Sequence, residues 1–162
     1  MVQGDDTIRV ELHTGPRHDL RRLFELAEDS AAELDGYIDA GRVLVALDAD
    51  RVGGHLQLTA TARPAEAEVK NMGVDPAYQR RGIGRALMAA AIAHAGREGC
   101  ATLVVATAAA DTGNLRFYQR LGFRLRSVER DAFTAATGYA PGLEIDGIVL
   151  RDRVWLDRDL DA

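Results

Sequence analysis

The chain has 162 residues, 47% of them hydrophobic and 28% charged, and this mixture predicts one folded domain over 1–162 with a buried core. A net charge of −5 argues against a general nucleic-acid binder. No apolar run approaches the ~20 residues of a membrane helix, and the chain start lacks the pattern of an export signal. A single cysteine, Cys100, and four scattered histidines predict neither a disulfide framework nor a metal site. We therefore expect a cytoplasmic protein without nucleic-acid, membrane or metal partners.

The first half of the chain predicts a strand, helices and then three more strands. Alternating apolar and polar residues indicate strands, whereas a period of three to four residues indicates amphipathic helices. A turn lies around Asp48 to Gly53, and a later strand stops before Asp75 and Pro76. The predicted segments are a strand over 7–12, one or two helices over 16–41, two strands within 42–62 and a strand over 67–74.

The second half alternates helices and strands. A helical apolar period begins at Gly82 and ends at Gly99. Its apolar face comprises Ile83, Ala86, Leu87, Ala90 and His94. The short apolar run 101–108 is typical of a strand buried on both faces. The remaining elements are a helix over 114–122 and strands over 123–129 and 147–160. The order βα(α)βββαβαββ predicts a mixed α/β sheet in one domain.

The segment Gln79–Leu87 reads QRRGIGRAL and places two glycines in three residues at the start of the predicted helix. Glycine weakens a helix, so another requirement must favour it here. Free main-chain N–H groups at a helix N-terminus bind phosphate, and glycines let the backbone approach phosphate oxygens closely. Arg80, Arg81 and Arg85 add positive charge. The segment therefore predicts a site for a diphosphate.

Three phosphate-binding motifs compete for this segment. A P-loop requires a lysine directly after its second glycine, and none stands there. A dinucleotide-binding fingerprint requires glycine or alanine three residues after Gly84, where this chain has Leu87. Its glycine turn must also follow the first strand of the sheet directly, whereas this segment follows a later strand. The remaining spacing is Q-x-x-G-x-G, formed by Gln79, Gly82 and Gly84, and on its own it is also compatible with a structural turn.

Two segments together carry a resemblance to a known family. VKNMGVDPAYQRRGIGRALM and NLRFYQRLGFR resemble the two signature regions of the GNAT superfamily of acetyl-CoA-dependent N-acetyltransferases, and the predicted element order matches that fold over the whole chain. The resemblance implies a single-domain α/β (α+β) GNAT fold, with a mixed, mostly antiparallel sheet of about seven strands flanked by helices. It also implies that main-chain N–H groups of one loop hold the pyrophosphate of coenzyme A. The implied loop comprises Gln79, Arg80, Arg81, Gly82, Ile83 and Gly84, with Arg85 next to it.

Acetyl transfer from a thioester to an amine requires an unprotonated amine, a polarised carbonyl and a proton for the departing thiolate. An alkylammonium with a pKa of about 10.4 is neutral in on the order of one molecule in a thousand at pH 7, so a base is useful. Glu68 lies on the strand before the loop, where GNAT enzymes with a glutamate base tend to carry it. The alternatives are a solvent-facing glutamate and one that positions a water in the proton path. Lys70, the only lysine, shares its face and is a structural partner, a solvated charge or a ligand-binding group.

The resemblance implies that a main-chain N–H of Met72, Gly73 or Val74 polarises the acetyl carbonyl. Gly73 also predicts a bulge that separates this strand from 101–108 and opens a cleft for the pantetheine arm. Met72 is in addition expected to belong partly to the core.

Tyr118 matches the tyrosine of the second signature region, which often protonates the coenzyme A thiolate in this family. The alternative is an aromatic side chain that simply packs against the cleft. An asparagine commonly precedes this tyrosine in the family and touches the pantetheine, but Asp111 stands at its position. Asn114 lies closer to the tyrosine and is favoured for that contact because it is uncharged.

The acceptor site in such folds comes from the first helices and from the loop between the last two strands, here 130–146. The apolar and acidic residues of this loop predict an apolar pocket with an acidic rim for an amine, although a loop packed on a core would need the same aromatics. These residues are Phe133, Tyr139, Leu143, Ile145, Asp131, Glu144 and Asp146.

We therefore predict an N-acetyltransferase that uses acetyl-CoA and a primary amine of a small molecule, or of a peptide, in a ternary complex without a metal. The alternative from another class is a non-catalytic acyl-CoA-binding sensor or assembly subunit. The last strand either pairs across a homodimer or completes the sheet. The acceptor itself is open.

Overall fold

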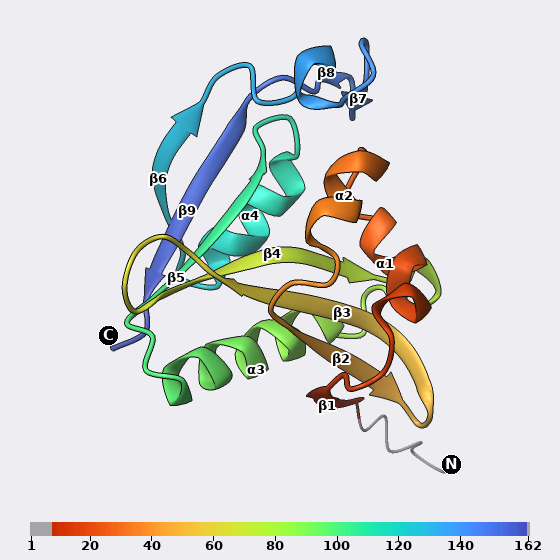
Figure 1. Cartoon of the computed structure of the whole chain (residues 1–162), viewed down its shortest axis with the longest axis vertical. Coiled ribbons are helices and arrows are strands. Elements are labelled where there is room, and N and C mark those ends of the chain that lie inside the picture. Colours follow the sequence, from red (N-terminus) through yellow and green to blue (C-terminus); the bar gives the residue numbers. More distant parts are fainter. Residues whose placement is uncertain (1–7, 162) are drawn as a thin grey trace.

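A seven-stranded sheet forms the body of the computed structural model, which describes residues 8–161 (Figure 1). The strands lie in the order β1-β2-β3-β4-β5-β9-β6, and every neighbouring pair is antiparallel except β4 and β5. This confirms the mixed, mostly antiparallel sheet. Thr7, which opens the first predicted strand, lies outside the described residues. The strands are β1 (Ile8–Leu12), β2 (Arg42–Asp48), β3 (Arg51–Ala60), β4 (Glu66–Val74), β5 (Thr102–Ala108), β6 (Arg124–Glu129) and β9 (Arg153–Asp159).

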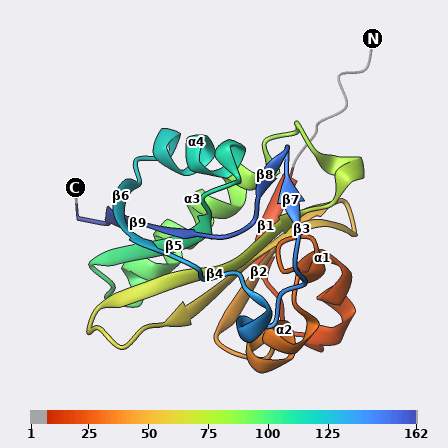
Figure 2. The ribbon, with the colours of Figure 1, turned by 90° about the horizontal axis from the view of Figure 1, so that it is seen from above.

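Helices cover both faces of this sheet (Figure 2). They are α1 (Arg21–Glu25), α2 (Ala31–Tyr37), α3 (Ile83–Arg97) and α4 (Thr112–Arg120), with short 3-10 helices η1 (Arg17–Leu20), η2 (Pro76–Tyr78) and η3 (Ala135–Thr137). Val43 and Val45 of β2 belong to the apolar cluster under α1 and α2, whereas Leu44 and Ala46 belong to the cluster under α3 and α4. Successive strand residues point to opposite faces, so β2 is buried on both sides.

The buried face of α3 is rotated from the predicted one. Ile83 and Leu87 are buried as expected, but Ala86, Ala90 and His94 are only half-buried. The fully buried residues are Ile83, Leu87, Met88, Ala91 and Ala95. The helix carries alanine on several sides, so its apolar period alone does not fix which side meets the sheet.

The sheet opens between β4 and β5. These two strands pair only from Glu66 to Val69, opposite Thr102 to Val105, and then diverge. A β-bulge lies at the same point, because Asn71 pairs with Gln57 and Val69 pairs with Leu58, leaving Lys70 unpaired. The bulge predicted at Gly73 is therefore at Lys70 instead.

Glycine is required at position 73 for a different structural reason. It pairs in register with His55, and a Cβ atom at this position would lie 2.6 Å from the carbonyl oxygen of Leu23 in α1. The glycine lets α1 approach β4 closely, so its requirement comes from packing across the sheet rather than from a bulge.

The predicted strand over 147–160 forms two separate elements. Strand β8 (Ile148–Val149) pairs with β7 (Glu144–Ile145) in a small hairpin. The turn residues Asp146 and Gly147 both have positive φ, which is typical of a tight two-residue hairpin turn. Strand β9 lies between β5 and β6, so it completes the sheet, and both of its own edges are paired within the chain.

Candidate active site

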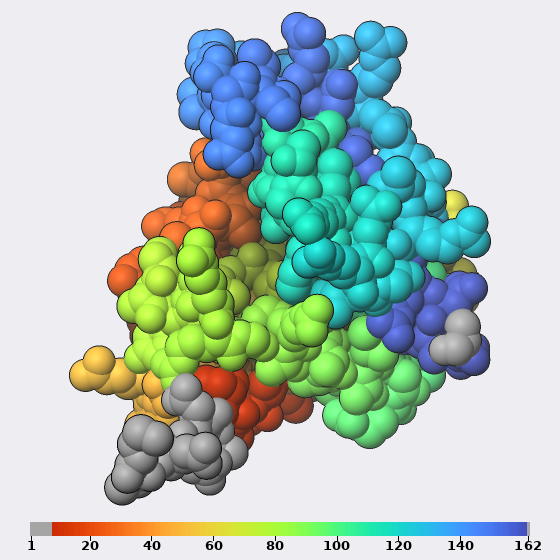
Figure 3. Space-filling view, turned by 180° about the vertical axis from the view of Figure 1, so that it is seen from behind, coloured from red at the N-terminus to blue at the C-terminus, as the bar shows by residue number. Residues whose placement is uncertain are grey.

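A cavity of about 700 Å³ lies where β4 and β5 diverge. In Figure 3 a hollow separates the yellow-green segment that precedes and opens α3 from the teal segment of α4. The structure brings together in this cavity nearly all the side chains and glycines predicted from sequence. They are Glu68, Met72, Gly73, Val74, Gln79, Arg80, Gly82, Ile83, Gly84, Arg85, Asn114 and Tyr118.

The glycine loop ends at the N-terminus of α3. Arg80 and Gly82 both have left-handed backbone conformations, with φ of 65° and 78°. The first main-chain hydrogen bond of the helix runs from Ala86 N to Gly82 O at 3.0 Å, and no described side chain caps this end. The N–H groups of the first helical turn therefore project from the helix end beside the cavity, as an anion-binding site requires.

Glycine is required at the two loop positions for different structural reasons. Gly82 needs its left-handed backbone, and a Cβ atom there would meet open space. Gly84 is half-buried, and a Cβ atom there would lie 3.2 Å from Cζ of Phe117 in α4. Gly84 thus lets α4 pack closely against the start of α3, and it also leaves the loop backbone accessible to a ligand.

Arg81 is the exception among the predicted residues. Its guanidinium donates to Asp48 Oδ2 at 2.9 Å and lies over the ring of Tyr78, 5.5 Å from the centroid. It is not among the residues that line the cavity, whereas Arg80 and Arg85 are. The side chain of Arg81 therefore ties the loop to the end of β2, and the expected positive charge beside the loop comes from the other two arginines.

Glu68 is half-buried in the cavity wall. Burial raises the pKa of its carboxyl above the ordinary value, although Lys70 and Arg153 offset part of this effect. Among the described residues, no group hydrogen-bonds to its carboxylate or forms an ion pair with it. The carboxylate is therefore available to accept a proton inside the cavity.

Tyr118 is buried, with its ring packed edge-on against Phe117 and Phe123 at centroid distances of 5.4 and 5.8 Å. Burial, together with Asp111, raises the pKa of its phenol, which stays protonated at neutral pH. Its hydroxyl has no hydrogen-bond partner among the described residues. The side chain combines the packing role with a free proton donor in the cavity.

Asp111 and Asn114 both line the cavity, but their side chains differ in the hydrogen bonds that they already make within the protein. Asp111 caps α4, its carboxylate accepting from the main-chain N–H of Asn114 at 2.9 Å. The amide of Asn114 makes only a long contact of 3.4 Å to Thr107 Oγ1. Asn114 thus keeps hydrogen-bonding capacity for a ligand.

The loop over 130–146 lines the end of the cavity where the sequence predicts the acceptor, called the acceptor end below. Its residues Phe133, Tyr139 and Ile145 line the cavity as predicted, and they also form a small apolar cluster that includes Leu143. The prediction of an acidic rim is wrong, because the three acidic side chains of the loop are exposed and do not line the cavity. These acids are Asp131, Glu144 and Asp146.

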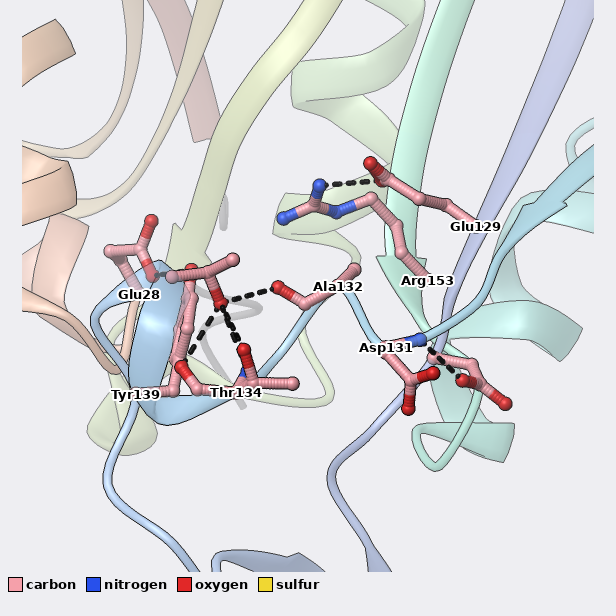
Figure 4. A network of polar contacts seen from close by, with 9 residues as sticks. Glu28, Glu129, Asp131, Ala132, Thr134, Tyr139 and Arg153 are labelled. Atoms are coloured by element: carbon pink, nitrogen blue, oxygen red, sulfur yellow. Dashed lines mark hydrogen bonds and ion pairs between the residues drawn. The ribbon is translucent and has the colours of Figure 1, made fainter.

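The cavity also contains residues that were not predicted from sequence as site residues, among them Glu28, Tyr37, Arg153 and Trp155. Tyr37 Oη donates to Glu28 Oε1 at 3.1 Å. Tyr139 Oη donates to Glu28 Oε2 at 2.9 Å (Figure 4). Glu28 thereby joins the segment between α1 and α2 to the loop over 130–146. Glu28 and Tyr37 lie in the region expected to bind the acceptor, but helical periodicity does not distinguish them from surface residues.

A buried polar chain holds Tyr37 in place. Asn71 donates to Tyr37 Oη at 3.0 Å and to Phe24 O at 3.1 Å, and its Oδ1 lies 2.8 Å from His55 Nε2. Burial lowers the pKa of His55 to about 4, so the ring is neutral at pH 7. The acceptor end is thus anchored to the interior of the sheet.

Within residues 8–161, no group of three or more His, Cys, Asp or Glu side chains is placed to hold a metal ion. No helix in that range is long and apolar enough to cross a membrane.

The model of the Acetyltransferase (GNAT) family matches residues 10–123. The uncharacterized N-acetyltransferase YvbK of Bacillus subtilis is 31% identical over 153 residues, covering 94% of this chain and 97% of the relative. A crystal structure of a Bacillus subtilis acetyltransferase in complex with CoA superposes with a TM-score of 0.86 at 31% identity, covering 94% of this chain and 99% of that one.

A GNAT acetyltransferase from Elizabethkingia anophelis with acetyl-CoA bound superposes with a TM-score of 0.83 at 26% identity, covering 96% of this chain and 99% of that one. Both superpositions cover nearly all of this chain, so it shares the fold of these acetyltransferases. The family model spans more than half of the chain, and the Bacillus subtilis relative matches nearly all of it. The chain therefore belongs to the GNAT family of acetyltransferases.

Proposed function

We propose that this enzyme transfers the acetyl group of acetyl-CoA to a primary amine of a small molecule or peptide, by direct attack in a ternary complex. One observation carries the proposal: a single cavity contains the glycine loop at the start of α3, the carboxylate of Glu68 and the hydroxyl of Tyr118. Membership of the GNAT family and the coenzyme in two structural relatives support acetyl-CoA as the donor.

The donor end of the cavity fits coenzyme A. The free N–H groups of the first turn of α3 bind the pyrophosphate, and Arg80 and Arg85 add positive charge. Asn114 lines the cavity from α4 and hydrogen-bonds to the pantetheine arm. Beyond Val69 the edge of β4 has no strand partner on the β5 side, so main-chain groups of Met72 to Val74 are open to the arm and the acetyl carbonyl.

The chemistry follows from the protonation states of two residues. Acetyl-CoA supplies the activated acyl group as a thioester. Glu68 accepts the proton of the acceptor ammonium, directly or through a water, and its raised pKa makes it a stronger base than an ordinary glutamate. Tyr118 gives its phenolic proton to the departing thiolate. No covalent nucleophile is needed, and Cys100 lies outside the cavity.

Tyr118→Phe tests this proposal because it removes one hydroxyl and keeps the packing of the ring. We expect turnover to fall by about 10²-fold or more, since positioned proton transfer contributes about 10²–10⁴ in rate, with calorimetric affinity for acetyl-CoA unchanged. Unchanged turnover would exclude Tyr118 from the reaction. A wild-type protein that binds acetyl-CoA and acetylates no amine would favour the non-catalytic sensor.

A further inference from the structure

The acceptor end of the cavity contains two cations that the acetyl-transfer steps do not use. They are Lys70, at the bulge of β4, and Arg153, at the start of β9. Arg153 donates to Glu129 at 2.8 Å (Figure 4). Its guanidinium also lies over the ring of Phe133, 4.9 Å from the centroid. Lys70 lies 4.8 Å from the centroid of Tyr37 and has no ion pair within residues 8–161. The only lysine of the chain is therefore an exposed cation at the cavity that lies near Glu68 but forms no ion pair within the described residues.

The bulge directs Lys70 into the acceptor end. Ala67 and Val69 point to the cluster under α3, and after the bulge Met72 and Val74 pack against that same cluster. The side chains of Glu68 and Lys70 therefore both face the α1 and α2 side, where Lys70 meets Tyr37. Residues two apart on a strand are separated by ~7 Å at Cα, so the two charges are close without forming an ion pair.

This spacing leaves room for a ligand that carries both charges. An ammonium bound to Glu68 and a carboxylate bound to Lys70 each need a charge-assisted hydrogen bond of about 2.8 Å. An α-amino acid presents these groups one carbon apart, which bridges two protein charges that do not touch. Apolar side chains also line this end of the cavity, namely Phe133, Trp155, Ile145 and Leu150.

The charges disfavour a polycation. Glu28 is the other central carboxylate here, and it already accepts hydrogen bonds from Tyr37, Tyr139 and the main-chain N–H of Ser30. A polyamine would be repelled by Lys70 and Arg153, and the carboxylates left to balance it are Glu68 and the exposed Asp29. A ligand with one ammonium and one carboxylate satisfies both signs.

We propose that the acceptor is a primary amine bearing a carboxylate next to it and an apolar side chain, that is, an apolar α-amino acid held by Glu68 and Lys70. This inference rests on the proposed acetyltransferase function.

The test compares acids with matched amines that lack the carboxylate. Acetylation of L-phenylalanine and L-leucine is measured beside their carboxamides and the corresponding decarboxylated amines, with the wild type and with Lys70→Met. Arg63→Met serves as the control, because Arg63 is an exposed cation in the turn between β3 and β4, outside the cavity. Binding of the same probes to the protein loaded with coenzyme A is followed by calorimetry.

We expect the wild type to prefer the acids over their amides by about 10-fold or more in kcat/KM. Lys70→Met should raise KM for the acids about 10–100-fold, the size of one charge-assisted hydrogen bond, and leave KM for the amides and affinity for acetyl-CoA unchanged. Arg63→Met should match the wild type.

The acceptor assignment and the acetyl-transfer proposal fail in different ways. Amides or decarboxylated amines that react as well as the acids, or acids whose KM does not depend on Lys70, would overturn the assignment while transfer stands. Acids that bind in a Lys70-dependent manner but are not acetylated would support the assignment and contradict transfer. Acids that neither bind nor react would overturn the assignment, whatever other amine is acetylated.

Discussion

At the scale of single residues, burial sets the protonation states on which the proposed chemistry depends. Glu68 has few polar neighbours, and its raised pKa makes it a better base than an exposed glutamate. Glu66, two positions earlier on the same strand, accepts from Arg126 at 3.0 Å and from Thr61 at 2.9 Å, and these hydrogen bonds lower its pKa despite its burial. The pKa values of these two glutamates of β4 are thus shifted in opposite directions, because Glu66 has hydrogen-bond partners and Glu68 has none among the described residues.

This contrast gives a matched pair of variants. We expect kcat/KM to rise with pH through an ionisation above the ordinary glutamate value, because Glu68 must be deprotonated to accept a proton. Glu68→Gln should lower kcat/KM by about 10²–10⁴-fold and remove this ionisation from the pH profile. Glu66→Gln should keep the rate and the profile of the wild type, since Glu66 lies outside the cavity. A Glu68→Gln enzyme with a wild-type profile would assign the base elsewhere.

At the scale of elements, the site depends on how closely α1 approaches the sheet. Gly73→Ala would place its Cβ atom 2.6 Å from the carbonyl oxygen of Leu23, and a backbone atom cannot move aside as a side chain does. We expect it to lower the free energy of unfolding by about 1–3 kcal/mol, the usual cost of overpacking. Gly96→Ala, in α3 with no atom within 4 Å of the new Cβ, should raise it by about 0.5–1 kcal/mol.

Urea unfolding of the two glycine variants measures both effects under one condition. Equal stability of the Gly73 variant and the wild type would contradict the close contact of α1 with β4.

The elements also divide into those that the sequence predicts and those that it does not. The main strands and α3 follow from local periodicity, and the glycine loop from its motif. The bulge at Lys70 depends on the register between β3 and β4, which no local pattern specifies. The hairpin of β7 and β8 has only two residues a strand, too few to show alternation.

The same division holds for the candidate site. The cavity contains twelve of the thirteen predicted site residues. Arg81 is the exception, because its partner Asp48 is 33 positions away in the chain. Glu28, Tyr37 and Arg153 were missed because tertiary packing, not a motif, brings them into the cavity. The acidic rim was misassigned for the same reason, since composition does not tell which way loop side chains point.

At the scale of the whole molecule, a buried neutral histidine links folding to pH. His55 has a pKa of about 4 in the folded protein, against about 6.5 when unfolded, so only the unfolded chain binds a proton between these values. Its contribution to stability is complete above about pH 6.5 and decreases as the pH falls, by about 3 kcal/mol in total at pH 4.

The stability of the wild type should therefore fall more steeply between pH 7 and pH 4.5 than that of His55→Gln, as measured by urea unfolding. Parallel curves for the two proteins would contradict this origin of the pH dependence. Nuclear magnetic resonance of the His55 ring gives an independent readout in the folded wild type, where no protonation is expected above about pH 5.

The central claim is that one cavity binds acetyl-CoA at the start of α3 and transfers its acetyl group to an amine. The most direct measurement is calorimetric titration with acetyl-CoA, followed by thiol release with a panel of amines, for the wild type and for Gly82→Asp. We predict binding and turnover for the wild type, and loss of both in the variant, whose carboxylate would oppose the diphosphate and whose left-handed backbone disfavours a side chain. Absence of acetyl-CoA binding to the wild type, or normal affinity in Gly82→Asp, would contradict the account.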